Sequence, residues 1–329
     1  MKFEWLKDKK LVGLGPMDGV TDSPMRQLAR HHGADFTSTE MISADGLVRK
    51  SKTIFKRLNF KKRERPIVAQ IFGKDPQIMG EAAKMLEHDF KFDAIDVNAA
   101  CPAKTVITSG HGGALLKNPG LLCSILDVVR HNTTLPVSLK TRCGYKDSSE
   151  IIKLAPKLEK TGINAIIVHG RTVLQKFQNS ADKTIFNRLK SEISVPLIAT
   201  GDIMNQNDIA DLFAHHKVDG VLVARGALGN PWIFEGLDII KNNPKLFLEK
   251  NQSKNLIQKI GVQEFKETVI KHLDLSIDYY GNEELACTLF RKHLLWYLGR
   301  IPGSKLLKVK ASIVKSRKQV EKILQFVNC

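Results

Sequence analysis

The sequence is poor in cysteine and contains no long apolar run. Its five cysteines, an odd number, are spread widely over 329 residues, without a C-x-x-C pair or a Cys/His cluster at zinc spacing. We therefore expect no disulfide framework, no iron–sulfur cluster and no bound metal. No stretch of about 18 consecutive apolar residues occurs, and the charged start MKFEWLKDKK lacks the apolar core of a signal peptide. These absences predict a cytoplasmic protein with reduced thiols and no membrane segment.

Acidic residues are also few compared with basic ones. The chain has 34 Asp and Glu against 51 Lys and Arg, which gives a formal net charge of +17. Folding does not require such an excess, and a polyanionic partner would use it, so nucleic acid is a candidate partner. The length, with 43% hydrophobic residues, is typical of a globular protein of about two domains.

Short aliphatic and β-branched runs alternate with stretches of helical periodicity over the first three quarters of the chain. Strand and helix in alternation indicate right-handed β-α-β units and a parallel sheet. Eight such units predict an α/β protein with a closed (β/α)8 TIM barrel over residues 1–240, and they fit an open sheet less well. The predicted strands are 11–17, 34–41, 66–73, 92–98, 136–143, 165–170, 196–201 and 220–224.

The strand pattern stops near residue 241, and the rest of the chain has helical periodicity only. Residues 241–329 are predicted to form a smaller all-helical domain, and they hold 17 Lys and Arg against 8 Asp and Glu. A solvated surface would explain a single run of charge. For so one-sided a run on a basic protein we favour a surface that follows phosphates. The expected contacts are Arg291, Lys292, Lys305 and Lys308.

Polar residues close several of the predicted strands. In a TIM barrel the active site is built at the carboxyl ends of the strands, so these side chains should converge there. Each has an ordinary structural explanation by itself, as a hydrogen-bonded or ion-paired side chain. Together they need a ligand, because a packed barrel end has no structural use for them. They are Gln70, Lys140, Arg142, His169 and Arg225.

The chemistry of these residues suits FMN. Glycines after the last two strands, followed by a helix start and Arg225, are typical of the phosphate site of TIM barrels. Gln70 can donate to and accept from a ring imide, and Lys140 and His169 can stabilise negative charge on a reduced flavin. Pro16 offers a flat, narrow surface for a ring. A dinucleotide is not expected, since no G-x-G-x-x-G follows a strand.

Cys101 lies in the loop after the fourth predicted strand, ahead of a glycine-rich segment. Most cysteines are small buried hydrophobic residues, and that interpretation suits Cys123. At the catalytic rim, however, a thiol is mostly protonated at neutral pH and can deliver a proton.

Taken together, the motifs resemble those of the tRNA-dihydrouridine synthase family of flavoenzymes. The resemblance implies FMN in a TIM barrel, NADPH as the reductant, a helical tRNA-binding domain and Cys101 as the proton donor. The matching stretches, in chain order, are GPMDGVTDSPMRQLA, TEM, AQIFG, DVNAACPAKTV, GGALLKNP, SLKTRCG, VHGRT, TGDI, RGALGNPWIF and RKHLLWYLGRIPG. The expected FMN contacts are Pro16, Met17, Asp18, Gln70, Lys140, His169, Thr200, Gly201, Asp202, Ala224 and Arg225.

Three positions depart from the usual family motifs. Ala100 stands where the family has glycine before the cysteine, which would strain the loop if that position needs a positive φ. Thr200 and Ala224 replace the usual Asn and Gly beside the flavin phosphate. None of these three changes removes a side chain that is expected to take part in the reaction.

The reaction implied by the resemblance is reduction of the C5–C6 double bond of uridine in tRNA to dihydrouridine. Asn98 would help to orient the base, and Lys104, Arg142 and Arg171 would contact the RNA. A monomer is expected. One alternative is a small-molecule FMN oxidoreductase of the dihydroorotate dehydrogenase kind, which would not need the basic helical domain. Another is a non-catalytic RNA-binding protein, which the intact Cys101 and Lys140 disfavour.

Overall fold

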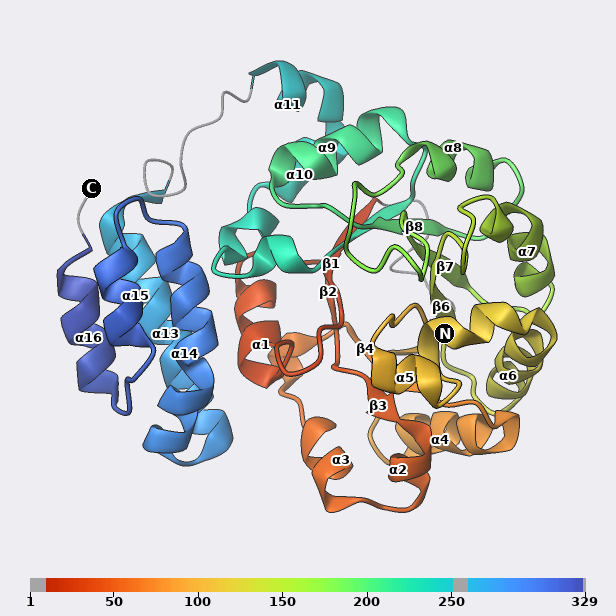
Figure 1. Cartoon of the computed structure of the whole chain (residues 1–329), viewed down its shortest axis with the longest axis horizontal. Coiled ribbons are helices and arrows are strands. Elements are labelled where there is room, and N and C mark those ends of the chain that lie inside the picture. Colours follow the sequence, from red (N-terminus) through yellow and green to blue (C-terminus); the bar gives the residue numbers. More distant parts are fainter. Residues whose placement is uncertain (1–9, 251–259, 328–329) are drawn as a thin grey trace.

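The structure is a computed structural model that describes residues 10–250 and 260–327. Within these residues, eight parallel strands pair side by side into a closed barrel surrounded by helices (Figure 1). The barrel closes where β2 pairs with β4, with Thr37 opposite Ile67. The expected TIM barrel is confirmed. Its strands are β1 (Leu11–Leu14), β2 (Phe36–Ser38), β4 (Ile67–Phe72), β5 (Ala94–Ala99), β6 (Val137–Arg142), β7 (Ala165–His169), β8 (Leu197–Thr200) and β9 (Gly220–Val223).

The first two strands are shorter than the sequence predicts. β1 ends at Leu14 instead of residue 17, because the chain turns at Pro16, which has no N–H for a ladder hydrogen bond. The run 34–41 forms only β2, and a separate two-residue strand, β3 (Ile42–Ser43), pairs with the end of β4. Residues 15–22 are thus a loop at the carboxyl end of β1.

The helices around the barrel begin at readable signals. α4 and α6 each have proline in the first turn, preceded by Asp75 and Asn118, whose side chains accept hydrogen bonds from the first turn. The helices of this part are α1 (Ser23–His31), α2 (Ala44–Val48), α3 (Lys52–Arg57), α4 (Pro76–His88), α5 (Lys104–Thr108), α6 (Pro119–His131), α7 (Glu150–Glu159), α8 (Thr184–Lys190), α9 (Gln206–His215), α10 (Leu237–Asn242) and α11 (Pro244–Lys250).

The barrel interior is filled by side chains and is not a pore. A small cluster that includes Phe36, Ile167 and Leu222 occupies the centre, separate from the large cluster between strands and helices. Gly13 makes room for this filling, because a Cβ there would lie 2.4 Å from the Phe36 ring. The packed centre leaves the open end of the barrel as the place for a ligand.

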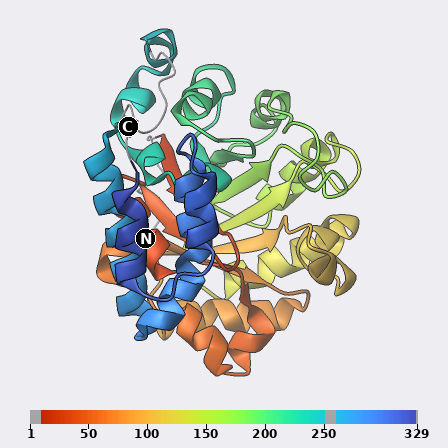
Figure 2. The ribbon, with the colours of Figure 1, turned by 60° about the vertical axis from the view of Figure 1, so that its left-hand side comes forward.

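A helical domain lies against one side of the barrel (Figures 1 and 2). Within the described residues its apolar cluster also takes in Leu28 and Trp232 of the barrel part. Residue 240, the expected boundary, lies inside α10, and both α10 and α11 contact α9 of the barrel. The division into two domains stays a prediction. The helices of the domain are α13 (Val262–Tyr280), α14 (Glu283–Gly299), α15 (Lys305–Ala311) and α16 (Arg317–Gln325).

The interface between the two parts has a closely packed aromatic cluster around Trp232. Trp232, which follows β9, stacks on Phe265 of α13 and meets the ring of Tyr297 of α14 edge to face. Its indole Nε1 donates to Glu264 at 2.7 Å. Gly229 allows the backbones to approach, since its φ is +63° and a Cβ there would lie 2.4 Å from the carbonyl carbon of Trp296. These contacts fix the helical domain on the barrel.

In the part of the chain that the structure describes, no helix is long and apolar enough to cross a membrane. Within the same residues, no group of three or more His, Cys, Asp or Glu side chains is arranged to hold a metal ion.

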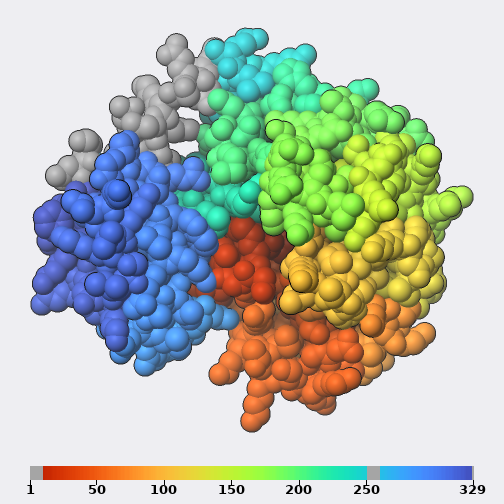
Figure 3. Space-filling view, in the orientation of Figure 1, coloured from red at the N-terminus to blue at the C-terminus, as the bar shows by residue number. Residues whose placement is uncertain are grey.

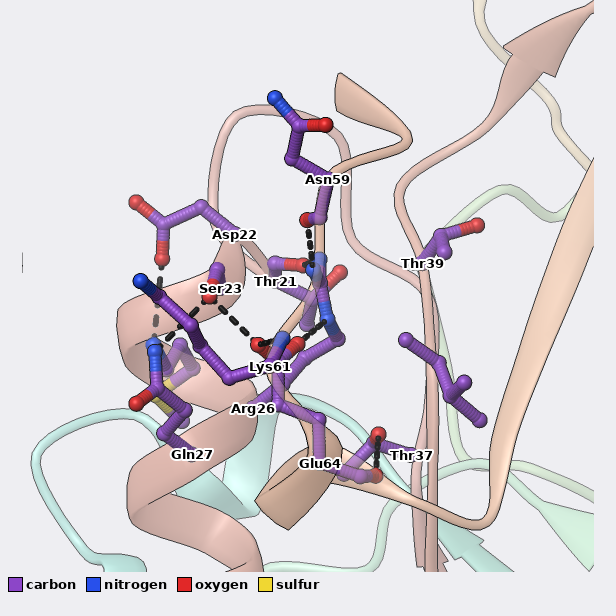
Figure 4. Close-up of polar contacts among 12 residues, drawn as sticks. Thr21, Asp22, Ser23, Arg26, Gln27, Thr37, Thr39, Asn59, Lys61 and Glu64 are labelled. Atoms are coloured by element: carbon purple, nitrogen blue, oxygen red, sulfur yellow. Dashed lines mark hydrogen bonds and ion pairs between the residues drawn. The ribbon is translucent and has the colours of Figure 1, made fainter. Parts of the chain in front are cut away.

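A buried ion pair joins α1 to the segment before β4 (Figure 4). Arg26 Nε lies 2.6 Å from Glu64 Oε2, and both side chains are essentially inaccessible to solvent. The remaining guanidinium nitrogens donate to the carbonyls of Thr21 and Asn59. Glu64 also accepts from Ser23 Oγ at 2.6 Å. The pair therefore ties the end of loop 15–22 to the segment that leads into β4.

We expect Arg26→Met to lower the free energy of unfolding by about 3–5 kcal/mol, because it leaves the Glu64 carboxylate buried without its partner. The double variant Arg26→Met/Glu64→Leu should recover much of this loss. Urea unfolding followed by circular dichroism measures both, with the exposed Arg49→Met as the control. A loss for Arg26→Met no larger than that of the control would contradict the structural role of the pair.

Candidate active site

A cavity of about 310 Å³ opens at the carboxyl ends of the barrel strands. All eleven residues expected to contact FMN line it, as do Asn98, Cys101 and Arg142. On the face drawn in Figure 3, the red N-terminal segment of the barrel lies recessed between the blue helical domain and the green and yellow loops. The structure therefore brings together side chains that lie more than 200 residues apart in the chain.

The floor of the cavity carries a chain of hydrogen bonds between neighbouring strands. Gln70 Nε2 on β4 donates to Asp96 Oδ2 on β5 at 2.7 Å, and Gln70 Oε1 accepts from Asn98 Nδ2 at 2.9 Å. Ser138 Oγ on β6 donates to the other Asp96 oxygen at 2.6 Å. Burial raises the pKa of Asp96 to about 6, although these hydrogen bonds and Lys140 oppose the shift. The network fixes the Gln70 amide at the bottom of the site.

Asn98 holds the loop that carries Cys101. Its Oδ1 accepts from the backbone N–H groups of Ala100 and Cys101 at 3.0 and 3.1 Å, and its Nδ2 donates to Gln70 and to Met41 Sδ. An amide of this kind has two donors and two acceptor sites, so all four are used within the protein. The geometry assigns Asn98 to positioning Cys101, and its part in orienting a base stays a prediction.

Cys101 is half-buried at the cavity rim with a free thiol. The following glycine-rich segment packs on it: Gly113 N donates to the Cys101 carbonyl at 3.1 Å, and a Cβ at Gly112 would lie 3.1 Å from Cys101 Cβ. Ala100 is not among the residues with positive φ, so alanine in place of the usual glycine causes no strain there.

Lys140 reaches the cavity from β6. Burial lowers the pKa of its amine to about 8, and the nearby Asp96 carboxylate limits the fall. The amine is therefore still mostly protonated at pH 7, and it loses its charge as the pH rises through about 8. Within the described residues Lys140 donates no hydrogen bond, which leaves its amine for a ligand.

His169, at the end of β7, is held as a neutral ring. Its Nδ1 accepts from the backbone N–H of Arg171 at 3.2 Å, so the proton belongs on Nε2, the atom on the Gly201 side. Burial and the cations around the ring lower the pKa of His169 to about 2. The side chain can thus donate a hydrogen bond from Nε2 at every physiological pH, but it cannot supply a positive charge.

Two arginines hold Asp202, in the loop after β8. Arg225 Nη2 lies 3.1 Å from Asp202 Oδ1, and the other Asp202 oxygen bonds to Arg171 at 2.5 Å. Arg171 is 3% exposed, and its guanidinium also donates to the carbonyls of residues 178 and 179. The Arg171 side chain is therefore buried and organises Asp202, and its contact with RNA stays a prediction.

Arg142 is buried on β6 and directed at the loops above. It donates to the carbonyls of Ala100, Thr172 and Lys176 at 2.9, 2.8 and 2.6 Å. Its Nη2 has no protein partner among the described residues, and the side chain lines the cavity. Arg142 is thus placed both to brace the Cys101 loop and to contact a ligand.

The site fits a flavin with a terminal phosphate. Three cations, Lys140, Arg142 and Arg225, line the cavity. Two carboxylates, those of Asp18 and Asp202, line it as well. The short helix η3 (Arg225–Ala227) starts at the rim as expected, and its first N–H groups have no acceptor within the helix. A charge excess beside free N–H groups suits an anion.

Sequence reasoning missed several apolar residues of the rim, among them Met41, Phe177 and Met204. Phe177 is 58% exposed, and its ring lies below both Arg142 and Arg225, at 5.5 and 5.2 Å. Phe177 and Met204 stand in loops without a motif, so only the fold reveals that they reach the cavity.

The predicted RNA contacts of the helical domain fall into two groups. Lys305 is exposed and Lys308 half-exposed on α15, free for an outside partner. By contrast, Arg291 donates to the Val314 carbonyl and Lys292 to the Gly19 carbonyl of the barrel. Lys104 begins α5 as an exposed side chain outside the cavity.

Sequence comparison finds related proteins of one family. The sequence profile described as dihydrouridine synthase (Dus) matches residues 13–328. The chain is 33% identical to tRNA-dihydrouridine synthase B of Pasteurella multocida over 291 residues, 88% of this chain and 84% of that protein. It is also 33% identical to tRNA-dihydrouridine synthase B of Pseudomonas aeruginosa over 293 residues, 89% and 85% of the two chains.

Among solved structures, histamine dehydrogenase from Rhizobium sp. 4-9 superposes with a TM-score of 0.54 at 10% identity, covering 83% of this chain and 51% of that one. This likeness shows the fold alone. The fold and the cavity define an enzyme of the TIM-barrel class with its site at the carboxyl ends of the strands. The matched profile then identifies the family: the chain belongs to the dihydrouridine synthases.

We expect the dissociation constant for added FMN to rise by about 10-fold between pH 7.5 and 9.5, because Lys140 loses its charge over that range and then donates a weaker hydrogen bond to the pyrimidine end of the flavin. Flavin fluorescence titration measures the constant. Lys140→Gln should bind FMN weakly at every pH in this range. Parallel pH profiles for the parent protein and Lys140→Gln would contradict a role for the Lys140 charge.

Proposed function

We propose that the protein is a tRNA-dihydrouridine synthase that reduces the C5–C6 double bond of specific uridines in tRNA, with FMN as cofactor and NADPH as reductant. The observation that carries the proposal is the meeting of one free thiol, Cys101, with a cationic cavity of flavin-compatible shape in a chain of this family. A cytoplasmic, monomeric enzyme is part of the same proposal.

The residues around the cavity divide into those that hold the cofactor and those that serve the base. Arg225 and the N–H groups at the start of η3 would hold the phosphate, and Gln70 would hydrogen-bond the ring imide. Lys140 and the neutral His169 would stabilise negative charge at the pyrimidine end of the ring. When bound, FMN supplies the hydride that adds to C6 of the uracil.

Cys101 would complete the reduction by donating the thiol proton to C5. Asn98 fixes the backbone N–H groups of residues 100 and 101, so the thiol stands at a set place on the rim. Arg142 holds the Ala100 carbonyl at 2.9 Å from the other side of the same loop. A general acid must lie within hydrogen-bond reach of its substrate atom, and the bracing of this loop supports that role for Cys101.

The substrate class follows from the chemistry and the charge together. A uridine inside a tRNA must leave its stack before it can lie in a cavity at the end of a barrel, which costs a few kcal/mol. Contacts between basic side chains and the RNA backbone would offset that cost. Lys305, Lys308 and Lys310 project from α15 of the helical domain for this purpose.

A small-molecule oxidoreductase of the dihydroorotate dehydrogenase kind is the rival that shares most of the cavity. It would use FMN and a loop cysteine but would have no need for the basic helical domain. A non-catalytic RNA-binding protein would need no cavity lined by Lys140 and Cys101.

We expect Cys101→Ala to keep FMN and its reduction by NADPH but to slow tRNA reduction by roughly 10²- to 10⁴-fold, the usual loss for a missing general acid. Rapid-mixing kinetics resolve the two half-reactions. Cys123→Ala, on α6 outside the cavity, is the matched control and should react as the parent protein does. Near-normal tRNA turnover in Cys101→Ala would remove the residue from the mechanism.

We expect neutralising Lys305, Lys308 and Lys310 together to weaken tRNA binding and to reduce the slope of log affinity against log salt by ~2 to 3, since up to about three counterions are no longer released. FMN content and NADPH oxidation should not change, because α15 lies outside the cavity. Filter binding at several salt concentrations gives the slope.

The matched control neutralises the exposed lysines Lys153, Lys157 and Lys160, which lie on and just after α7, on the side of the barrel away from the helical domain in Figure 1. This control should leave both affinity and slope unchanged. A merely solubilising role of α15 predicts equal slopes for the two triple variants and the parent protein.

A further inference from the structure

Two loops that line the cavity are contacted on their outer side, away from the cavity, by helices of the helical domain. One is loop 15–22, between β1 and α1, and the other is loop 224–230, which follows β9. The inner faces of both loops line the cavity. Their outer faces meet α13 and α14, which lie in front of the barrel in Figure 2.

Loop 15–22 receives two hydrogen bonds from the helical domain. The Lys292 amine on α14 donates to the Gly19 carbonyl. Tyr280 Oη, at the end of α13, donates to Asp22 Oδ2 at 2.8 Å, while the other Asp22 oxygen accepts from the first turn of α1. Gly19 forms the tip, where φ is +71° and a Cβ would meet nothing within 4 Å. The Gly19 N–H also donates to the Glu40 carboxylate of the barrel, so the tip is held by both parts of the protein.

These contacts lie next to residues that line the cavity. Met17 and Asp18 line it and immediately precede Gly19. Within the loop, Met17 N donates to Thr21 Oγ1 at 3.0 Å, and the Met17 carbonyl accepts the N–H of Thr21 at 3.0 Å. This internal bonding makes the loop one unit, so a shift at the tip or at Asp22 would move Met17 as well.

Loop 224–230 receives a corresponding contact. Arg300 Nη2, just after α14, donates to the carbonyls of Gly226 and Leu228 at 3.2 and 3.1 Å. Gly226 lies inside the short helix η3 and Leu228 directly follows it, and the first residue of this helix, Arg225, lines the cavity. The close approach of the α14 backbone at Gly229 fixes the same loop from one residue further along.

We propose that Lys292, Tyr280 and Arg300 are positioning residues that shape the flavin site from the helical domain. The inference rests on the proposed function, which assigns the cavity to FMN. The helical domain then has two roles, because it completes the cofactor site in addition to binding RNA. Lys292 serves the cofactor site, because its amine donates a hydrogen bond to the barrel. Its charge also opposes the rise that burial causes in the pKa of Asp22.

The first test compares Lys292→Met with Lys271→Met. Lys271 on α13 also reaches the barrel, where its amine meets His31 Nε2 at 2.8 Å at the far end of α1, away from both loops. We expect Lys292→Met to raise the FMN dissociation constant about 5- to 10-fold, the loss of one hydrogen bond to a charged donor. Lys271→Met should leave it unchanged, and Lys292→Arg should restore most of the affinity.

The second test uses two adjacent tyrosines. Tyr280→Phe removes the hydroxyl that bonds Asp22, whereas Tyr279→Phe removes one that donates to the Lys56 carbonyl at 3.2 Å, outside both loops. We expect only Tyr280→Phe to raise the FMN dissociation constant and to alter the visible absorption and circular dichroism of the bound flavin. Melting temperatures of the cofactor-free variants should agree, which separates positioning from general loss of stability.

The outcomes test the role of the helical domain in the flavin site separately from the proposed function. If Lys292 contacts RNA instead, Lys292→Met will weaken tRNA binding and lower its salt slope while FMN affinity stays at the parent value, and that result overturns the inference. Parent-like FMN binding and flavin spectra in both Lys292→Met and Tyr280→Phe overturn it as well. Failure of the parent protein itself to bind FMN would overturn the proposed function.

Discussion

The pairing of β2 with β4 is the constraint on which the rest of the structure depends. It closes the sheet, so that the carboxyl ends of all eight barrel strands meet at one rim. Residues that are far apart in the sequence, such as Gln70 and Arg225, come within reach of one ligand for this reason. The buried pair of Arg26 and Glu64 stabilises the closure, because it connects α1 to the segment that leads into β4.

Charge gives the rim its chemical character. The cations at the ends of β6 and β9 outnumber the carboxylates around them. Burial lowers the pKa of two neighbouring bases, but only one of them is neutral at pH 7. Lys140, near Asp96, keeps a pKa of about 8 and its charge at neutral pH. His169, among the cations, has a pKa lowered to about 2 and serves as a neutral hydrogen-bond donor. The site therefore attracts an anion and offers it both a charge and a fixed dipole.

Much of this arrangement could be predicted from the sequence, because strand periodicity marks where each strand ends and TIM barrels use those ends. All eleven expected cofactor contacts line one cavity. Periodicity does not reveal the partners of single side chains. Arg171 bonds Asp202 and Lys292 bonds a barrel carbonyl, contacts that no sequence pattern indicates, and the RNA contacts of both residues stay predictions. The sequence of α11 has helical periodicity only, yet this helix contacts α9 of the barrel, so periodicity does not show which part of the protein a helix joins.

The most direct measurement is the fate of uridine in a tRNA transcript that carries no modification. The transcript is incubated with the purified protein, FMN and NADPH, digested to nucleosides and oligonucleotides, and analysed by mass spectrometry. The account predicts that uridine at defined positions gains two hydrogen atoms, and that the gain requires both the protein and the reductant. Unchanged uridine throughout the transcript, with the flavin bound and reduced by NADPH, would contradict it.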